Sequence, residues 1–243
     1  MNFQKFLLTE SINDKGRFKA LFVIGSAGAG KSYTIDQLNG VITPKIINTD
    51  RFLEFYAKKI GVKATPDNWQ SMFRDKTKST TEKMTYHYLN GLLPLFIDST
   101  SNNVSNIISR AAVLESIGYD IGYVFVNANI ETVLKRVQLR NNTIDREVDL
   151  DFVKKVHSKV NDDVEFLRNK GNFFLEINNS EGELTNEVIN TIFKKAQGFF
   201  NGELKNPIGK RIIEELESTK QKYLVPEVYS DEDLKKKVER WYK

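Results

Sequence analysis

The sequence predicts an α/β fold in which a five-stranded parallel sheet carries helices on both faces. Five short apolar runs recur along the chain, segments with helical spacing alternate with them, and a glycine-rich turn joins the first run to a helix. Near-continuous apolar strands that alternate with helices are typical of a parallel sheet buried on both faces. Side chains that follow the strands should therefore meet in one crevice at the carboxyl end of the sheet.

The expected elements follow one another at short intervals. The strands are Leu21–Ile24, Lys45–Asn48, Leu95–Asp98, Ile121–Val126 and Phe173–Ile177. Pro94 stands at a strand start, where its missing N–H costs little. The helices, assigned from apolar residues at intervals of three and four, are Ser32–Leu38, Asn103–Ile117, Ile130–Arg140, Asp151–Asn169 and Thr185–Ala196.

Residues 25–32 read Gly-Ser-Ala-Gly-Ala-Gly-Lys-Ser, which is the pattern of a phosphate-binding P-loop, and they lie between an expected strand and an expected helix. Glycines let the backbone curl so that several N–H groups point at one anion, and the helix dipole adds partial positive charge. Lys31 should reach the β- and γ-phosphates, and the Ser32 hydroxyl should ligate Mg²⁺. The residues expected to bind the nucleotide are Gly25, Ser26, Ala27, Gly28, Ala29, Gly30, Lys31, Ser32, Tyr33 and Arg136. The pattern predicts binding of a nucleoside triphosphate.

Composition narrows the chemistry that remains open. The 243 residues suit one large domain, or one domain with an appendage, and carry a net charge of +4. That mild excess suits anionic ligands without requiring nucleic acid. Because the chain has no cysteine, disulfides, thiolate catalysis and cysteine–zinc sites are excluded, and its two histidines are far apart. With neither a signal peptide nor an apolar run of membrane-spanning length, we expect a soluble protein of the cytoplasm.

Two aspartates are expected where strands end. Asp50 closes the run 46–50, and Asp98 closes the run 95–98. If the strand order is that of P-loop kinases, 2-3-1-4-5, Asp98 lies beside the P-loop strand and acts on Mg²⁺ through its water shell. Asp50 then lies one strand further out, where it could accept the proton of an acceptor hydroxyl as phosphoryl transfer proceeds. The two roles could be exchanged, and each aspartate could instead be a helix cap or turn residue.

Three arginines form a second group of candidate residues. Arg136 and Arg140 are one helical turn apart, and Arg146 follows a polar connector. Like charges four residues apart on a helix are mildly destabilising, and neither arginine of the pair has an acidic residue three or four positions away. We expect a lid at about residues 140–149 that closes over the triphosphate, with local pairing to acidic neighbours as the alternative. Arg51 and Arg110 could also reach the crevice.

Two regions fall outside the regular alternation. The stretch 65–91 is polar with interleaved aromatics (Trp69, Phe73, Tyr86 and Tyr88), which could stack on a base but at this spacing are more typical of core. We divide the chain into a P-loop kinase-type domain over 1–198 and a helical C-terminal extension, 199–243, packed on the core. Within the extension, residues 230–233 resemble a capping box before a short helix that carries Leu234, Val238 and Trp241 on one face.

With these residues laid out, the chain resembles the zeta-toxin and polynucleotide-kinase group of P-loop kinases, especially members encoded by tailed phages. The resemblance covers roughly residues 15–180 and depends on the P-loop, on residues 47–51 (Ile-Asn-Thr-Asp-Arg), on 97–100 (Ile-Asp-Ser-Thr), and on 139–140 with 146–148. It implies a five-stranded parallel sheet, ATP as the nucleotide, Asp50 as the base that activates an acceptor hydroxyl, and Arg140 and Arg146 as lid residues that bind ATP phosphates. Acceptors differ widely within the group, so the resemblance names none.

The function expected from these residues is ATP-dependent transfer of the γ-phosphoryl group to a hydroxyl acceptor, by a monomer that uses Mg²⁺. Lys31, Asp50, Arg140 and Arg146 are the expected catalytic residues. A polynucleotide 5′ end, a sugar nucleotide and a small metabolite all stay open as acceptors. The alternatives are a nucleoside monophosphate kinase, an ATPase that couples hydrolysis to remodelling, and a nucleotide-binding module without catalysis. Ser99 counts against the ATPase, because such enzymes usually place a glutamate directly after the Walker B aspartate.

Overall fold

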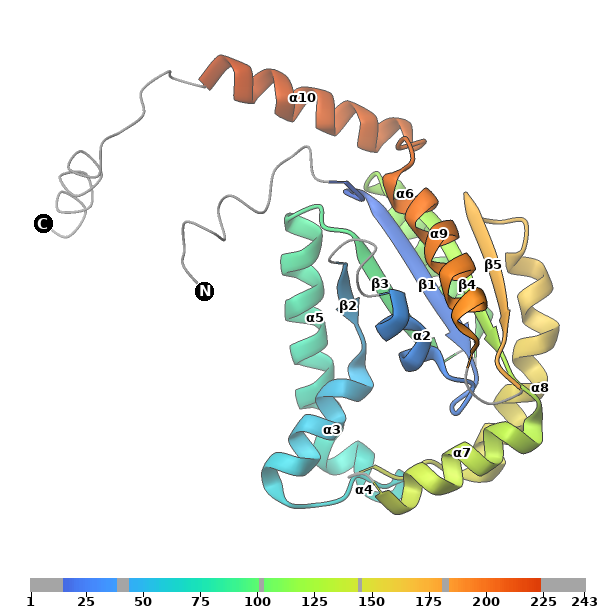
Figure 1. Ribbon diagram of the computed structural model, residues 1–243. Helices are drawn as coiled ribbons and strands as arrows, with labels where there is room; N and C mark the ends of the chain where they lie inside the picture. The colour runs from blue at the N-terminus through green and yellow to red at the C-terminus, as the bar shows by residue number, and fades with distance from the viewer. Residues whose placement is uncertain (1–14, 39–43, 101–102, 144–145, 181–183, 224–243) are drawn as a thin grey trace, which may run out of the picture.

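A five-stranded sheet of parallel strands forms the centre of the computed structural model, which describes residues 15–38, 44–100, 103–143, 146–180 and 184–223 (Figure 1). The strands are β1 (Lys19–Gly25), β2 (Lys45–Ile47), β3 (Leu95–Thr100), β4 (Asp120–Asn127) and β5 (Phe173–Asn178). Their order is β2-β3-β1-β4-β5. The predicted fold class and the predicted strand order are thereby confirmed.

Helices connect the strands and cover both faces of the sheet, as Figure 1 shows. Those with bounds close to the expected ones are α2 (Lys31–Leu38), α6 (Val104–Ser116), α7 (Ile130–Thr143), α8 (Leu150–Leu167) and α9 (Asn186–Asn201). Side-chain caps explain where several of them begin, because Asn103, Asp149 and Thr185 each accept a hydrogen bond from a backbone N–H of the first turn. The remaining helices are α3 (Thr49–Ile60), α4 (Pro66–Asn68), the π-helical turn η1 (Trp69–Phe73), α5 (Arg74–Asn90) and α10 (Pro207–Tyr223).

Two apolar cores, one on each face, bury the sheet. Alternate residues of β1 point to opposite faces, so Leu21 and Val23 pack with α2 and α9, whereas Phe22 and Ile24 pack with α6 and α8. The side chains of all four are fully buried. Since β1 lies in the middle of the sheet, β3 and β4 hold its carboxyl end from both sides.

Helices α3 and α5 are absent from the expected elements, and α3 bears on the site. Strand β2 ends at Ile47, and Asn48 caps α3 by accepting hydrogen bonds from the backbone N–H groups of Asp50 (2.8 Å) and Arg51 (3.3 Å). The expectation that Asp50 closes a strand is therefore wrong, because it lies in the first turn of a helix. Gly61, in a left-handed conformation, ends the helix.

The polar stretch 65–91 forms α4, η1 and α5, which pack against α3. Phe73 is buried with Leu53 and Ala57, and Trp69 packs against the same cluster. Tyr88 packs against the core that Phe22 and Ile24 share with α6 and α8, whereas Tyr86 is 63% exposed. The expectation that aromatics at this spacing belong to the core is met by Phe73, Trp69 and Tyr88.

The C-terminal part of the chain begins inside a helix. Helix α9 runs through the expected boundary at residues 198 and 199, and its Phe199 and Phe200 belong to the core. Helix α10 lies at the end of the sheet opposite the glycine-rich loop (Figure 1), where Ile212 and Ile213 pack against the core. The expected capping box at 230–233 and the helix after it lie outside the described residues. The division into a kinase-type domain and an extension stays a prediction.

A buried ion pair fastens the chain to the sheet just before α10. Asp120, which is 1% exposed, accepts hydrogen bonds from Lys19 Nζ at 2.7 Å and from the backbone N–H groups of Lys205 and Asn206 at 2.9 and 2.8 Å. These bonds compensate a carboxylate that would be costly to bury alone. Among the described helices, none is long and apolar enough to cross a membrane.

Candidate functional site

The glycine-rich loop curls between the end of β1 and the start of α2, as its pattern predicts. Gly28 and Gly30 have φ angles of +84° and +102°, a region that side chains rarely adopt. A Cβ on Gly28 would also lie 2.7 Å from the backbone oxygen of Val133 in α7, and one on Gly30 would collide with the Asn179 side chain. Glycine is therefore required at both positions by backbone conformation and by close packing.

Lys31 is the first residue of α2, and its ammonium group is buried against the loop. Its Nζ donates to the carbonyl oxygens of Gly25 and Ser26, both at 3.0 Å, and lies 3.9 Å from Asp98 Oδ1. Burial lowers the pKa of Lys31, and the nearby carboxylates of Asp98 and Asp50 oppose that shift. A buried cation held at the mouth of an N–H-lined loop suits an incoming polyphosphate.

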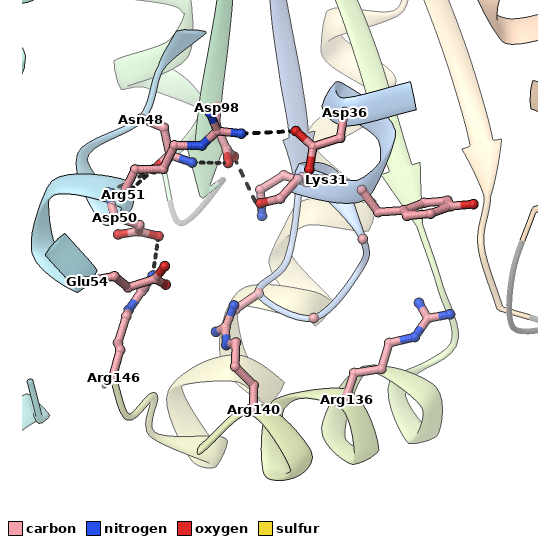
Figure 2. A pocket seen from close by; sticks show the side chains of 15 residues that line it. Lys31, Asp36, Asn48, Asp50, Arg51, Glu54, Asp98, Arg136, Arg140 and Arg146 are labelled. Carbon is pink, nitrogen blue, oxygen red and sulfur yellow. Dashed lines mark hydrogen bonds and ion pairs between the residues drawn. The ribbon is translucent and has the colours of Figure 1, made fainter. Parts of the chain in front are cut away.

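A polar pocket of about 360 Å³ opens in front of the loop (Figure 2). It is lined by Ala27, Gly28, Gly30, Lys31, Ser32, Tyr33, Asp36, Asn48, Asp50, Arg51, Glu54, Asp98, Arg136, Arg140 and Arg146. The structure thus brings together every expected catalytic residue, the two expected metal ligands and Tyr33. Gly25, Ser26 and Ala29 do not line the pocket but shape it, because their carbonyl oxygens accept hydrogen bonds from Lys31 and Asn179.

The two aspartates face this pocket from neighbouring elements. Asp98 lies within β3, which continues to Thr100, and its Oδ2 accepts a 2.7 Å hydrogen bond from Asn48 Nδ2. Burial raises the pKa of Asp98, and Lys31 counters the rise. Asp50 comes from α3 and is more open, with 39% of its side chain exposed. One carboxylate is therefore deep beside the P-loop lysine, and the other is accessible to a ligand.

Of the four arginines that line the pocket, Arg51 comes from α3 and pairs with Asp36 at 3.1 Å, whereas the other three come from α7 and the chain after it. Arg136 and Arg140 project from α7, as Figure 2 shows, and Arg146 follows that helix. Arg146 Nη1 lies 2.7 Å from Asp50 Oδ2 and 3.8 Å from Glu54 Oε1. Burial and the neighbouring Arg146 charge both lower the pKa of Arg140. The acidic partners of Arg146 thus come from α3 rather than from its sequence neighbours.

The expected lid at residues 140–149 is only partly a connector, because Arg140 lies within α7. Arg146 forms a β-bridge with Ala64, whose carbonyl oxygen accepts a 2.7 Å hydrogen bond from Glu147 N. The side-chain amide of Asn141 donates a hydrogen bond to the backbone oxygen of Val148 and accepts one from its backbone N–H. These contacts tie the described part of the connector to the turn after α3, and closure of a lid stays a prediction.

Four further residues build the site without having been singled out from the sequence. Asn48 caps α3 and also donates a hydrogen bond to Asp98. Glu54, one helical turn after Asp50, lies near the same guanidinium group of Arg146 as Asp50 does. Asn179 donates to the Ala29 carbonyl oxygen at 2.8 Å, and His157 Nδ1 shares a 3.3 Å hydrogen bond with Ser26 Oγ. Only the four-residue spacing of Asp50 and Glu54 could have been noticed in the sequence, and only if α3 had been predicted.

The oxygen groups near the loop fit a magnesium ion that shares its coordination with a nucleotide. Ser32 is exposed at the start of α2, and Asp98 supplies a carboxylate in the same pocket. Within the part of the chain that the structure describes, no three His, Asp or Glu side chains gather closely enough to hold a metal unaided. Mg²⁺ usually keeps several waters and takes substrate phosphates as ligands, so two protein oxygens suffice.

A second polar pocket adjoins the first and shares Asn48, Asp50 and Asp98 with it. Its volume is about 400 Å³, and its further lining residues are Thr49, Ser99, Asn103, Asn106, Ser109 and Arg110. The aromatics of residues 65–91 line neither polar pocket. Tyr88 instead joins Phe52, Phe55, Tyr56 and Met84 in a mainly apolar groove between α3 and α5.

Known structures share this fold. The chain matches a candidate kinase from Chloroflexus aurantiacus with a TM-score of 0.50 and 16% identity, over 75% of this chain and 98% of that one. It also resembles a protein of the PezAT toxin–antitoxin system of Streptococcus pneumoniae (TM-score 0.46, 18% identity, 91% of this chain and 94% of that one). A third likeness is to a chain of the Pnkp1/Rnl/Hen1 RNA repair complex (TM-score 0.48, 16% identity, 63% of this chain and 47% of that one).

At 16% identity, the likeness to the Chloroflexus aurantiacus protein shows the fold alone, which is that of P-loop kinases. No curated protein matches the chain by sequence. The family model described as zeta toxin, however, matches residues 6–186, a span that contains the P-loop, Asp50, Asp98 and all four arginines that line the pocket. The chain belongs to the zeta toxin family.

Proposed function

We propose that this protein is an ATP-dependent phosphotransferase that moves the γ-phosphoryl group to a hydroxyl acceptor. One observation carries the proposal: the P-loop pocket and the second polar pocket meet at Asp50 and Asp98. A donor bound on the loop and an acceptor bound in the second pocket would therefore face each other across the two carboxylates. Such juxtaposition is the main requirement of phosphoryl transfer, in which positioning and charge stabilisation supply most of the catalysis.

On the donor side, the loop N–H groups, Lys31 and the arginines would bind the triphosphate. Arg136 and Arg140 on α7 and Arg146 after it surround the pocket with positive charge, which a triphosphate would neutralise. Ser32 and Asp98 would hold Mg²⁺, which when bound neutralises phosphate charge. Because Arg146 also holds Asp50, the same side chain could couple the donor phosphates to the acceptor base.

On the acceptor side, Asp50 would take the proton of the attacking hydroxyl. The acceptor oxygen forms a bond to the γ-phosphorus while the bond from that phosphorus to the β,γ-bridging oxygen breaks, and ADP leaves. Asp50 suits this role because its carboxylate is accessible and is oriented by Arg146 at 2.7 Å. Every side chain named here comes from one chain, so we propose that a monomer is sufficient.

The test is transfer of label from γ-labelled ATP with Mg²⁺ to a panel of hydroxyl acceptors. Lys31→Ala should abolish transfer because it removes the buried cation at the loop, and Asp50→Asn should lower it by about 10²- to 10⁴-fold because it removes the base. Matched controls are Lys154→Ala and Asp151→Asn, an exposed pair on α8 outside both polar pockets. Both controls should retain wild-type transfer.

Two results would contradict the proposal. Release of label only as inorganic phosphate, insensitive to Asp50→Asn but lost in Lys31→Ala, would indicate an ATPase. Transfer that tolerates Asp50→Asn and uses nucleoside monophosphates would indicate that the acceptor is already ionised and needs no base.

A further inference from the structure

The second polar pocket has a lining unlike that of most small-molecule sites. Hydrophobic and aromatic side chains usually predominate in such sites, whose volumes span roughly 300–1,000 Å³. This pocket, at about 400 Å³, is at the small end of that range, and its nine lining residues carry only hydroxyl, amide, carboxylate and guanidinium groups. A ligand that fits it would be compact and would offer many hydrogen-bonding groups.

Helix α6 supplies the outer wall of the pocket through one polar face. Ile107, Ala111 and Leu114 of this helix are buried in the core, which turns Asn106, Ser109 and Arg110 toward the pocket at helical spacing. Asn103 caps the helix with its amide oxygen, which leaves the amide N–H₂ group for a ligand. Amides and hydroxyls both donate and accept, as recognition of sugar-like hydroxyls requires.

Arg110 is the cation of this outer wall. The two carboxylates of the pocket have cations on the P-loop side, since Asp50 pairs with Arg146 at 2.7 Å and Asp98 faces Lys31 at 3.9 Å. Among the described residues, no carboxylate lies within ion-pair distance of Arg110, whose side chain is exposed. The planar guanidinium fork binds carboxylate or phosphate oxygens in a bidentate manner, so an anion on the ligand would complete the pocket.

Aromatic side chains gather elsewhere. Phe52, Phe55, Tyr56 and Tyr88 line the groove between α3 and α5, which meets the polar pocket only at Asn48. A nucleobase seeks stacking partners, which the lining of the polar pocket does not offer. The polar pocket therefore favours an acceptor without a base.

From these observations, and resting on the proposed phosphotransferase function, we infer that the acceptor is a compact polyhydroxylated molecule with one anionic group, such as a sugar acid or a sugar phosphate. Its hydroxyls would bond Asn103, Asn106 and Ser109, its anionic group would bind Arg110, and one hydroxyl would reach Asp50. The transfer itself is the one described above, with the hydroxyl proton going to Asp50 and ADP as the leaving group.

The experiment uses γ-labelled ATP and Mg²⁺ with two anionic probes, D-gluconate and glucose 6-phosphate, and with D-glucose and D-glucitol as uncharged counterparts. A 5′-hydroxyl oligonucleotide and a sugar nucleotide complete the set. The probes are also titrated onto the ADP-bound protein by calorimetry, so that binding is measured independently of turnover. The anionic probe that accepts label more efficiently shows whether the anionic group of the acceptor is a carboxylate or a phosphate.

The matched variants are Arg110→Gln and Phe55→Ala, both at exposed positions outside the P-loop pocket. Arg110→Gln should raise KM for the anionic probe by roughly 10- to 100-fold, the equivalent of one lost hydrogen bond to a charged group, with kcat changed little. Arg110→Lys should recover part of the loss, and affinity for ATP should be the same in all three variants. Phe55→Ala should leave KM for the anionic probe unchanged.

Transfer confined to the oligonucleotide or the sugar nucleotide, weakened by Phe55→Ala but not by Arg110→Gln, would overturn this inference and leave the phosphotransferase intact. Equal use of glucose and gluconate would also overturn it, as would failure of every anionic probe both to bind and to accept label. Hydrolysis without transfer to any probe would instead refute the proposed function itself.

Discussion

Asn48 contacts both the helix that carries Asp50 and the carboxylate of Asp98, so suitable replacements of Asn48 should perturb Asp98 and leave the position of Asp50 unchanged. Its amide oxygen caps α3, which carries Asp50, while its amide nitrogen donates to Asp98 at 2.7 Å. In Asn48→Ser the cap is retained, because serine and asparagine are comparable caps, but the shorter side chain carries no amide to reach Asp98. In Asn48→Asp the cap is also retained, and a like charge replaces the donor.

The expected magnitude follows from that one hydrogen bond. A hydrogen bond to a charged group contributes about 1.5–3 kcal/mol. Its loss in Asn48→Ser should weaken magnesium-dependent binding of ATP by about 10- to 150-fold if Asp98 must be charged to assist the ion. Burial already raises the pKa of Asp98, and the lost bond to the carboxylate should raise it further. The loss of ATP affinity should therefore be greatest at acid pH and should diminish as the pH rises.

The assay is a magnesium titration of a fluorescent ATP analogue between pH 5.5 and 9, which needs no knowledge of the acceptor. Asn48→Asp should be the more severe variant near neutral pH, because two adjacent buried carboxylates cannot both ionise readily. Thermal unfolding of the variants checks that the cap of α3 is intact. Magnesium dependence within twofold of the wild type across this pH range in Asn48→Ser would refute the reasoning.

Three further predictions concern the loop, the sheet and the arginine pair. Gly28→Ala should lower the free energy of unfolding by at least 1–2 kcal/mol, because φ is +84° at this position and α7 blocks the new Cβ. Gly198 in α9 has open space around it, so the control Gly198→Ala should be neutral or stabilising in the same thermal melts. Asp120→Asn should cost about 3–5 kcal/mol in denaturant unfolding, since it leaves a buried lysine without its carboxylate; a loss below 1 kcal/mol would contradict this account. Glu54→Gln should bind ATP up to about fivefold more tightly at pH 8, because the carboxylate no longer competes for Arg146. Burial raises the pKa of Glu54, so the wild-type carboxyl protonates as the pH falls and the difference in calorimetric affinity should shrink; a difference independent of pH would exclude this cause.

Much of the fold could be predicted because local patterns reflect it directly. Strands buried on both faces must be apolar throughout, and helices that cover them must be amphipathic, so β1, β3, β4 and β5 were placed within two residues of their observed ends. Helix α3 was missed because its first residues, Thr49 and Asp50, were assigned to the end of the run 46–50, and the cap at Asn48 becomes evident only when the hydrogen bonds are known.

The candidate site was predictable to a different extent for each residue. Lys31 and Ser32 belong to a contiguous motif whose spacing is fixed by the phosphate it binds. Asp50 and Asp98 could be proposed because residues that follow the strands of a parallel sheet gather at one edge, and the arginines because two of them lie one helical turn apart without an acidic neighbour. Their partners could not, because the pairing of Arg146 with Asp50 depends on the β-bridge between Ala64 and Arg146.

The sequence by itself determined that this chain has a P-loop between a strand and a helix within a parallel α/β sheet, because those features are written in neighbouring residues. Only the tertiary structure decided which side chains share the crevice. It placed Asn48 between two carboxylates, Glu54 on Arg146, and the polar face of α6 opposite Asp50. Such contacts join residues far apart in the chain, and sequence spacing carries no information about them until packing brings the elements together.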